Sequence, residues 1–338
     1  MRKLISKILL VLCLTVILWM VSSCMEDINK PVEVEFNNTG DLITHFETNG
    51  DFINSNENPA LISAEELYAI VDNSLLLDLR TASDFSYGHI QGAINLNLSD
   101  LIDTLEIKNL DQFMNITVIS ATGQKAAYAV SLLRLYGFTN IYSLDYGMGQ
   151  WNEIFAKPWI EARGDAEYSW SFTVNYYSKQ PLEKNLPALS FNDPQVPTKN
   201  LIQNRIIPML TEEAYLRSIG TVQDLDDDYV RLYRKFENIA LICYSEPDLY
   251  DIKRFFKDAQ PPITWGGHYK STIYYNPSYD FKASTNLLTL PVDKTFYIYS
   301  YNGQRSQYIT AYLRLLGYDA RSVLFGAISI TCVVIWQC

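Results

Sequence analysis

Short apolar runs alternate with segments of helical periodicity over the first half of the chain. Four of these runs have the length and composition of buried parallel strands: residues 74–79, 92–97, 115–120 and 139–147. Residues 60–71 and 124–136 instead repeat their apolar positions at the period of a helix. Ser63 and Glu66 have the spacing of a capping box at the start of the first of these helices. Strands that alternate with helices predict a parallel sheet covered on both faces.

The second half of the chain repeats this order of elements. Residues 238–245 and 294–300 are apolar runs, and residues 304–316 have helical periodicity up to Gly317, where a glycine favours the end of a helix. Thr211 stands in the N-cap position of a further predicted helix, without an acidic or amide residue three positions on. The second half therefore predicts its own sheet and helices.

Two sequence motifs occur once in each half, in the same order. The stretch "VISATGQKA" from Val118 resembles "IYSYNGQRS" from Ile298, and "GHIQGAINL" resembles "GHYKSTIYY". The interval from Gly88 to Gly123 is 35 residues, and that from Gly267 to Gly303 is 36 residues. Two motifs that keep both their order and their spacing indicate an internal duplication.

The N-terminus has the pattern of a targeting segment. Residues 8–21 form an apolar run after three basic residues, which is the length of a signal-peptide core rather than of a spanning helix. The following "VSSC" resembles the lipobox of bacterial lipoproteins, which implies cleavage before Cys24 and its lipidation; an uncleaved anchor is the alternative. Acidic residues just after Cys24 resemble the surface-export signal of some Gram-negative lipoproteins. We therefore expect an outer-membrane protein, facing the periplasm or the cell surface.

These patterns divide the chain into five predicted parts. They are a signal peptide at 1–23, a tether with some local structure at 24–59, a first domain at 60–164, an inter-domain connection at 165–204 and a second domain at 205–338. The apolar, uncharged tail after Ala327 is atypical of such a domain, and either truncation or an edge strand accounts for it.

Composition narrows the classes of function. Apolar residues make up 48% of the chain and charged residues 19%, which favours packed cores over disorder. A net charge of −11 argues against a nucleic-acid partner. Cys243 lies in an apolar run, where a buried and inert thiol is expected. No Cys/His cluster has the spacing of metal ligands, so we expect neither a metal nor another cofactor.

The motifs of the first half resemble the rhodanese family of sulfurtransferase-like domains. The stretches "LLDLRTASDFSYGHIQGAINL", "VISATGQKA" and "GFTNIYSLDYGMGQW" carry the resemblance, which covers residues 62–160 well and residues 206–327 more loosely. It implies an α/β fold class with two rhodanese-like three-layer α/β/α domains, each with a central parallel sheet. In active members a cysteine begins the loop after the central strand and carries sulfur as a persulfide. Ser120 and Ser300 stand at that position in this chain.

Each of these loops leads from a strand through a glycine into the start of a helix. The first N–H groups of a helix lack partners within it, and together with the helix dipole they favour an anion. A basic residue adds positive charge to each loop, although an ion pair between Lys125 and Asp78 or another carboxylate is an alternative. The predicted anion-binding loops are Ser120, Ala121, Thr122, Gly123, Gln124 and Lys125, and Ser300, Tyr301, Asn302, Gly303, Gln304 and Arg305.

A serine at the start of the loop removes the sulfur chemistry of the family. A hydroxyl cannot form a persulfide, and its activation as a nucleophile needs an adjacent base, which neither loop contains. His89 lies in the "GHIQGA" motif, where the resemblance implies a structural hydrogen bond. We therefore predict no catalytic residue and an inactive rhodanese-like lipoprotein of the bacterial envelope that binds an anion, another ligand or a partner. Its expected partners are the membrane, through Cys24, and a small anion or an envelope protein. The alternatives are a sulfurtransferase that carries sulfur on Cys243 and a purely structural tandem with empty loops.

Overall fold

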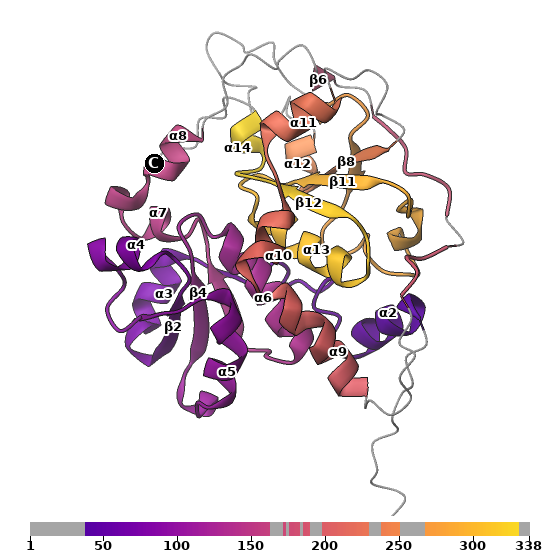
Figure 1. Cartoon of the computed structure of the whole chain (residues 1–338). Helices are drawn as coiled ribbons and strands as arrows, with labels where there is room; N and C mark the ends of the chain where they lie inside the picture. The colour runs from indigo at the N-terminus through magenta and orange to yellow at the C-terminus, as the bar shows by residue number, and fades with distance from the viewer. Residues whose placement is uncertain are drawn as a thin grey trace, which may run out of the picture.

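The computed structural model describes residues 38–162, 172–173, 176–182, 185–189, 198–229, 238–250 and 268–330, and these contain two five-stranded parallel sheets (Figure 1). The first sheet has the strand order β1-β5-β4-β2-β3 and the second has the order β10-β8-β11-β12-β7. Each central strand, β4 or β11, ends at one of the two predicted loops. The predicted α/β class with two parallel sheets is confirmed.

The strands have the following bounds. The first sheet consists of β1 (Leu61–Ile62), β2 (Ser74–Asp78), β3 (Ile94–Asn95), β4 (Asn115–Ile119) and β5 (Ile141–Leu144). The second consists of β7 (Ile219–Gly220), β8 (Ile239–Tyr244), β10 (Ile273–Tyr275), β11 (Thr295–Tyr299) and β12 (Ala320–Val323). A short antiparallel pair joins β6 (Phe172–Thr173) to β9 (His268–Tyr269). Every residue of β4 is buried, as expected for a strand covered on both faces.

Helices pack around both sheets. The first half contains α2 (Thr39–Thr48), α3 (Ala64–Ile70), α4 (Ala82–Tyr87), α5 (Leu101–Glu106), α6 (Gln124–Tyr136), α7 (Met148–Trp151) and α8 (Lys157–Glu161). The second contains α9 (Thr198–Ile206), α10 (Glu212–Arg217), α11 (Val222–Tyr229), α12 (Pro247–Tyr250), α13 (Gln304–Leu315) and α14 (Ala327–Ile330). The 3-10 turns are η1 (Val71–Asn73), η2 (Leu98–Asp100), η3 (Leu110–Gln112), η4 (Glu153–Phe155), η6 (Ile207–Met209) and η8 (Leu287–Thr289).

Local signals in the sequence set several helix ends. Ser63 and Glu66 form the predicted capping box of α3, in which the Glu66 N–H donates to the Ser63 hydroxyl and the Ser63 N–H donates to the Glu66 carboxylate. Gly137 follows α6 with a φ of 126°, and Gly317 follows α13 with a φ of 95°. Both values lie in the left-handed region that glycine adopts most easily, so both predicted helix ends are present.

The helix that Thr211 is predicted to cap is present, but it is not the counterpart of α3. Thr211 does cap α10, since its hydroxyl accepts the N–H of Ala214 at 3.2 Å. The helix that follows β7, as α3 follows β1, is α11. Its capping box is formed by Thr221 and Asp224, whose N–H groups each bond to the other's side chain. Helix α10 is therefore an additional helix ahead of the second sheet.

Residues 38–59, which we expected to be a tether, are folded against the second half. Helix α2 buries Leu42, Ile43 and Phe46, and the Phe46 ring lies 6.2 Å from that of Tyr312 in α13. Farther along, the Asn54 amide donates to the Phe281 carbonyl at 3.3 Å. The apolar face of α2 explains the difference, because it buries surface that a solvated tether would expose.

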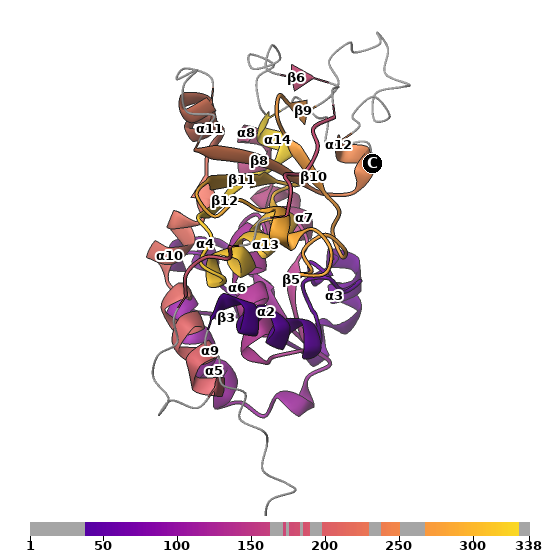
Figure 2. The same ribbon diagram turned by 90° about the vertical axis from the view of Figure 1, so that its right-hand side faces the viewer.

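Helices α6 and α13 lie side by side between the two sheets (Figures 1 and 2). Their buried residues, among them Tyr128 and Leu132 of α6 and Tyr308 and Tyr312 of α13, belong to one hydrophobic core that extends through both halves. The loops that precede the two helices therefore meet at the join between the halves.

Within the described ranges, no helix combines the length and the apolar character that crossing a bilayer requires. The predicted signal peptide, Cys24, Cys332 and Cys338 all lie outside the described residues.

Candidate functional site

The two predicted loops have matching backbone geometry. Each leaves its central strand at a serine and enters a helix through a glycine, with φ values of 80° at Gly123 and 82° at Gly303. A Cβ atom at Gly123 would lie 2.2 Å from Nε2 of Gln304, and one at Gly303 would lie 2.3 Å from Nε2 of Gln124. Each position therefore requires glycine for two reasons: the backbone turn has a positive φ, and the other loop comes too close for a side chain.

The serine hydroxyls lie inside the loops rather than at an open surface. Ser120 is 4% exposed and Ser300 is 2% exposed. The Ser120 hydroxyl accepts the N–H of Ala126 at 3.2 Å, and the Ser300 hydroxyl accepts the N–H of Ser306 at 3.1 Å. Each serine thus satisfies an N–H group in the first turn of its helix, where an anion was expected to bind.

The side chain of Gln124 reaches from the first loop into the second half. Its Nε2 donates to the carbonyls of Gly303 and Val323, both at 3.3 Å, and its Oε1 accepts the N–H of Phe325 at 2.7 Å. The Gln124 side chain is fully buried, and its polar atoms are satisfied by these three backbone groups. Gln124 therefore links its own loop to the backbone that surrounds the second loop.

The side chain of Gln304 makes the reciprocal connection. Its Nε2 donates to the Leu144 carbonyl at 3.1 Å, and its Oε1 accepts the N–H of Tyr146 at 2.7 Å. Asn302 supports it from within the second loop by donating to the same Oε1 at 2.9 Å. The two glutamines thus exchange hydrogen bonds between the halves.

The basic residue of each loop is already engaged. Lys125 contacts both carboxylate oxygens of Glu212, at 2.9 and 2.7 Å, so Glu212 and not Asp78 is its ion-pair partner. Arg305 donates to the Asn58 carbonyl at 3.0 Å, and its Nη2 lies 3.6 Å from the Glu246 carboxylate. Both cations that we expected to attract an anion are therefore committed to protein oxygen atoms.

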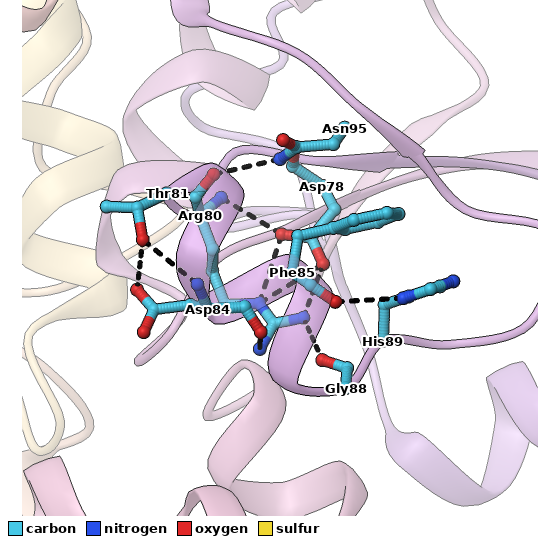
Figure 3. A network of polar contacts seen from close by, with 8 residues as sticks. All are labelled: Asp78, Arg80, Thr81, Asp84, Phe85, Gly88, His89 and Asn95. Atoms are coloured by element: carbon cyan, nitrogen blue, oxygen red, sulfur yellow. Dashed lines mark hydrogen bonds and ion pairs between the residues drawn. The ribbon is translucent and has the colours of Figure 1, made fainter.

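Asp78 belongs to a separate network at the end of β2 (Figure 3). Its carboxylate accepts hydrogen bonds from Nε and Nη2 of Arg80, and Nη2 also donates to the Gly88 carbonyl at 2.7 Å. Asn95 closes the network by donating to the Arg80 carbonyl at 2.9 Å. Both members of the ion pair are buried. This arrangement fixes the segment between β2 and β3 and leaves Asp78 no role in the loop.

His89 contributes to the same segment through Phe85. Its Nδ1 lies 2.9 Å from the Phe85 carbonyl oxygen, and the two rings stack with their centroids 3.9 Å apart (Figure 3). The structural hydrogen bond that the family resemblance implied is present. These contacts give no support to a role for His89 as the base of a serine nucleophile.

Cys243 has the inert character that its apolar surroundings predicted. It lies in β8 and is fully buried. Burial raises the pKa of its thiol to about 12, against a hydrogen bond from Tyr299 that lowers it. Since the thiolate is the form that attacks and carries sulfur, this thiol is unreactive near neutral pH.

The glutamine pair is the feature of the site that sequence reasoning missed. The signal was present, because both loops contain the same Gly-Gln pair, at Gly123–Gln124 and Gly303–Gln304. Its meaning depends on the two loops facing each other, which a repeat in the sequence does not reveal. Glu212 was missed for a related reason, since it lies on the additional helix α10.

Comparison with known proteins places the first half in a family. The sequence model of the rhodanese-like domain matches residues 63–154. Thiosulfate sulfurtransferase GlpE of Pseudomonas entomophila is 31% identical over 107 residues, which cover 31% of this chain and 94% of that protein. Thiosulfate sulfurtransferase GlpE of Shewanella oneidensis is 33% identical over 78 residues, covering 23% and 75%. The crystal structure of a rhodanese-related protein from Thermoplasma volcanium is 30% identical and covers 28% of this chain and 92% of that one, with a TM-score of 0.26, too low to support an argument about fold.

Proposed function

Because the chain belongs to the family of rhodanese-like domains, we propose that it is a tandem member that no longer transfers sulfur and acts as a binding module of the bacterial envelope. The tandem arrangement is supported by two sheets with corresponding strand order and by two loops with the same backbone geometry. The lipobox-like stretch before Cys24 supports attachment to a membrane.

The observation that carries the loss of sulfur transfer is the buried serine at the start of each loop. A hydroxyl cannot take the place of a thiolate as the sulfur carrier, because it forms no persulfide and remains protonated near neutral pH. Ser120 and Ser300 each accept an N–H from their own helix, so even the electrostatic position that favours an anion is filled by a neutral group.

The same geometry argues against the loops as binding sites for a free anion. Lys125 and Arg305 are paired, and the side chains of Gln124 and Gln304 cross between the loops. We infer that the loops now join the two halves, and that binding takes place elsewhere on the molecule. A sulfurtransferase that uses Cys243 is the weaker reading, since burial keeps that thiol protonated.

Sulfur transfer from thiosulfate to cyanide tests this proposal. We expect the purified full-length protein to give no thiocyanate above the rate without enzyme, while GlpE of Pseudomonas entomophila serves as the active control. Mass spectrometry after incubation with thiosulfate should find no added sulfur on Cys243. Turnover that Ser120→Ala or Ser300→Ala abolishes, or a persulfide on Cys243, would overturn the proposal.

Cysteine variants distinguish two causes of inactivity: the absence of a sulfur-carrying nucleophile, and a loop that substrate cannot reach. We expect Ser120→Cys and Ser300→Cys to remain inactive, because the loops stay covered by the opposite glutamine. Adding Gln304→Ala to Ser120→Cys opens the first loop and is expected to give the first measurable transfer. Activity in the single cysteine variants would show that the loops are accessible.

A further inference from the structure

Arg134 and Arg314 occupy equivalent positions in the two halves. Each lies 14 residues after the serine of its loop, in α6 or α13. Arg134 donates to the carbonyl of Ile141 at 3.0 Å, and Arg314 donates to the carbonyl of Ala320 at 3.1 Å. Since Ile141 and Ala320 are the first residues of β5 and β12, the two guanidinium groups have the same contact with the backbone.

The surroundings of Arg134 are filled by the segment that precedes the first sheet. The Arg134 side chain is completely buried, and its Nη1 lies 2.6 Å from the carboxylate of Glu57. The guanidinium carbon lies 5.4 Å from the ring centre of Phe52. Tyr308 of α13 adjoins this pair: burial raises the pKa of its hydroxyl, Arg134 lowers it and Glu57 raises it again. A glutamate carboxylate thus completes the first of the two equivalent sites.

Arg314 lines a cavity of about 510 Å³ that is broadly open to solvent. Its wall includes Tyr128, Arg205, Met209, Arg314, Tyr318 and Asp319. Tyr128 of α6 lies beside Arg314 as Tyr308 of α13 lies beside Arg134, in agreement with the equivalence of the two sites. The volume is within the range of small-molecule sites, about 300–1,000 Å³.

Among residues 198–217, the described residues directly ahead of the second sheet, none repeats the contact made by Glu57. This segment forms α9, η6 and α10, and its Glu212 pairs with Lys125 of the first half. The carboxylate that pairs with Arg314 is Asp319, at 3.7 Å, and Asp319 is about half exposed. Asp319 also accepts the Thr295 hydroxyl at 2.7 Å, which holds it toward β11. Arg314 therefore has a longer ion pair than Arg134, and its own side chain is more exposed.

Two arginines, Arg205 and Arg314, line the cavity against one carboxylate, Asp319, although the chain as a whole carries a net charge of −11. Burial lowers the pKa of Arg314, Tyr128 and Asp319 raise it, and the positive charges of Arg321 and Arg217 lower it by a smaller amount. Arg205 lines the cavity and donates through Nε and Nη2 to the Leu315 carbonyl, at 3.1 and 2.6 Å. A guanidinium in such surroundings favours an added anion, and its planar donors suit a carboxylate.

We propose that the cavity at Arg314 binds the carboxylate group of a small organic acid, in the manner in which Glu57 binds Arg134. The apolar part of the ligand packs against Met209 and Tyr318, and Tyr128 lies beside the carboxylate. The site is independent of the two serine loops, so its existence does not depend on the loss of sulfur transfer.

Isothermal titration of the full-length protein with N-acetyl-glutamic acid α-amide tests this site, because the probe carries the Glu57 side chain as its only charge. The neutral control is N-acetyl-glutamine α-amide. We expect saturable binding of the acid that is at least about tenfold tighter than that of the amide. Equal affinity for the two probes, or no binding of the acid up to about 20 mM, would overturn the proposal.

Two variants locate the binding. Arg314→Gln is expected to weaken binding of the acid probe at least about tenfold, so that the affinity for the acid no longer exceeds the affinity for the amide probe. Arg217→Gln removes a nearby charge that does not line the cavity, and is expected to weaken binding less than about threefold. Unchanged affinity in a folded Arg314→Gln protein overturns the assignment. If Arg314→Gln does not fold, Arg314→Lys takes its place, with an expected loss of about tenfold because a lysine lacks the planar pair of donors.

Inorganic phosphate distinguishes a carboxylate site from a general anion site. We expect phosphate to compete only weakly with the acid probe, at a concentration at least about tenfold higher than the acid itself requires. Competition by phosphate at the same concentration as the acid would contradict the carboxylate assignment.

Discussion

Gln124 and Gln304 each hydrogen-bond to the backbone of the half to which the other belongs. Gln124 bonds to Gly303, Val323 and Phe325, and Gln304 bonds to Leu144 and Tyr146. Both side chains are fully buried, and the Phe325 N–H has Gln124 as its acceptor. The loop in which the family resemblance places a sulfur-carrying cysteine is here a structural contact between two halves of one chain.

Removing either glutamine side chain is expected to destabilise the whole protein. Gln124→Ala removes three hydrogen bonds and leaves the Phe325 N–H without its acceptor, and Gln304→Ala removes the bonds to Leu144 and Tyr146, so we expect each to lower the free energy of unfolding by about 2–4 kcal/mol. Urea unfolding followed by circular dichroism measures the change. The exposed Gln112→Ala is the control, with an expected change within about 0.5 kcal/mol. A loss of similar size in the control and in Gln124→Ala would contradict the role of the crossing side chains.

Gly123 is expected to tolerate alanine less well than another glycine with the same backbone conformation. Gly92→Ala has only the backbone strain of a φ of 85°, because nothing lies within 4 Å of its added Cβ, and we expect a cost of about 1–2 kcal/mol. Gly123→Ala adds a clash with Gln304 and with the Leu144 carbonyl, so we expect at least about 2 kcal/mol more.

The variant Gly123→Ala/Gln304→Ala tests the source of this extra cost. If the clash with Gln304 is responsible, the two changes together should cost less than the sum of the two single changes, because the alanine at 304 relieves the overlap. Strict additivity in urea unfolding would show that the two loops do not press on each other.

The raised pKa of Cys243 predicts a dependence of stability on pH. A thiol with a pKa of about 12 in the folded protein and of about 8.5 when unfolded keeps its proton more tightly in the folded state. Its contribution to stability is therefore complete below about pH 8.5 and is lost as the pH rises toward 12. Urea midpoints measured between pH 8 and 11 should fall for the wild-type protein, and should fall less for Cys243→Ala.

The same burial predicts that Cys243 reacts only after unfolding. We expect iodoacetamide at pH 8 to leave Cys243 unmodified in the folded protein and to alkylate it in urea, as read by peptide mass. Complete modification of the folded protein within minutes would show that the thiol is accessible, and would restore Cys243 as a candidate sulfur carrier.

The ion pair of Arg134 and Glu57 is expected to be important for stability. Glu57→Ala leaves a fully buried guanidinium without its carboxylate, and we expect a loss of about 1–3 kcal/mol, moderated by the exposure of Glu57 itself. Glu161→Ala removes one partner of an exposed ion pair with Lys157 and is the matched control, with an expected loss below about 0.5 kcal/mol. Similar melting temperatures for both variants would contradict this difference.

Lipidation of Cys24 is the prediction that tests envelope attachment. We expect radiolabelled palmitate to be incorporated into the protein when it is produced in a Gram-negative host, and Cys24→Ala to abolish that label. Cys338→Ala, which removes a cysteine at the other end of the chain, should leave it unchanged. Label that persists in Cys24→Ala would exclude the proposed lipidation site.

The local patterns of the sequence predicted the elements well, but did not predict how the two halves meet. The runs around β2, β4 and β5, the capping box of Ser63 and the helix end at Gly137 depend on neighbouring residues and on burial, which a sequence expresses directly. The pairing of Lys125 with Glu212 joins positions 87 residues apart on different halves. No local pattern identifies such a partner, so sequence reasoning could offer only Asp78 or another carboxylate for Lys125, and the structure has Glu212.

Residues 38–59 are a second case in which the local sequence did not predict a contact with a distant part of the chain. Their polar composition predicted a tether, yet Leu42, Ile43 and Phe46 suffice to attach α2 to the core. Three apolar residues on one helical face are a weak signal within a polar stretch, and their value depends on a complementary surface that the remainder of the fold supplies.

The contacts of this N-terminal segment also constrain the order in which the molecule is completed. Asn54 bonds to a residue 227 positions later in the chain, and Glu47 accepts an N–H from one 236 positions later. A nascent polypeptide presents residues 38–59 long before their binding surface has been synthesised. The first sheet can assemble while translation continues, but its leading segment has to wait until Phe281 and Ala283 have been synthesised, so these contacts form late relative to the sheet they flank.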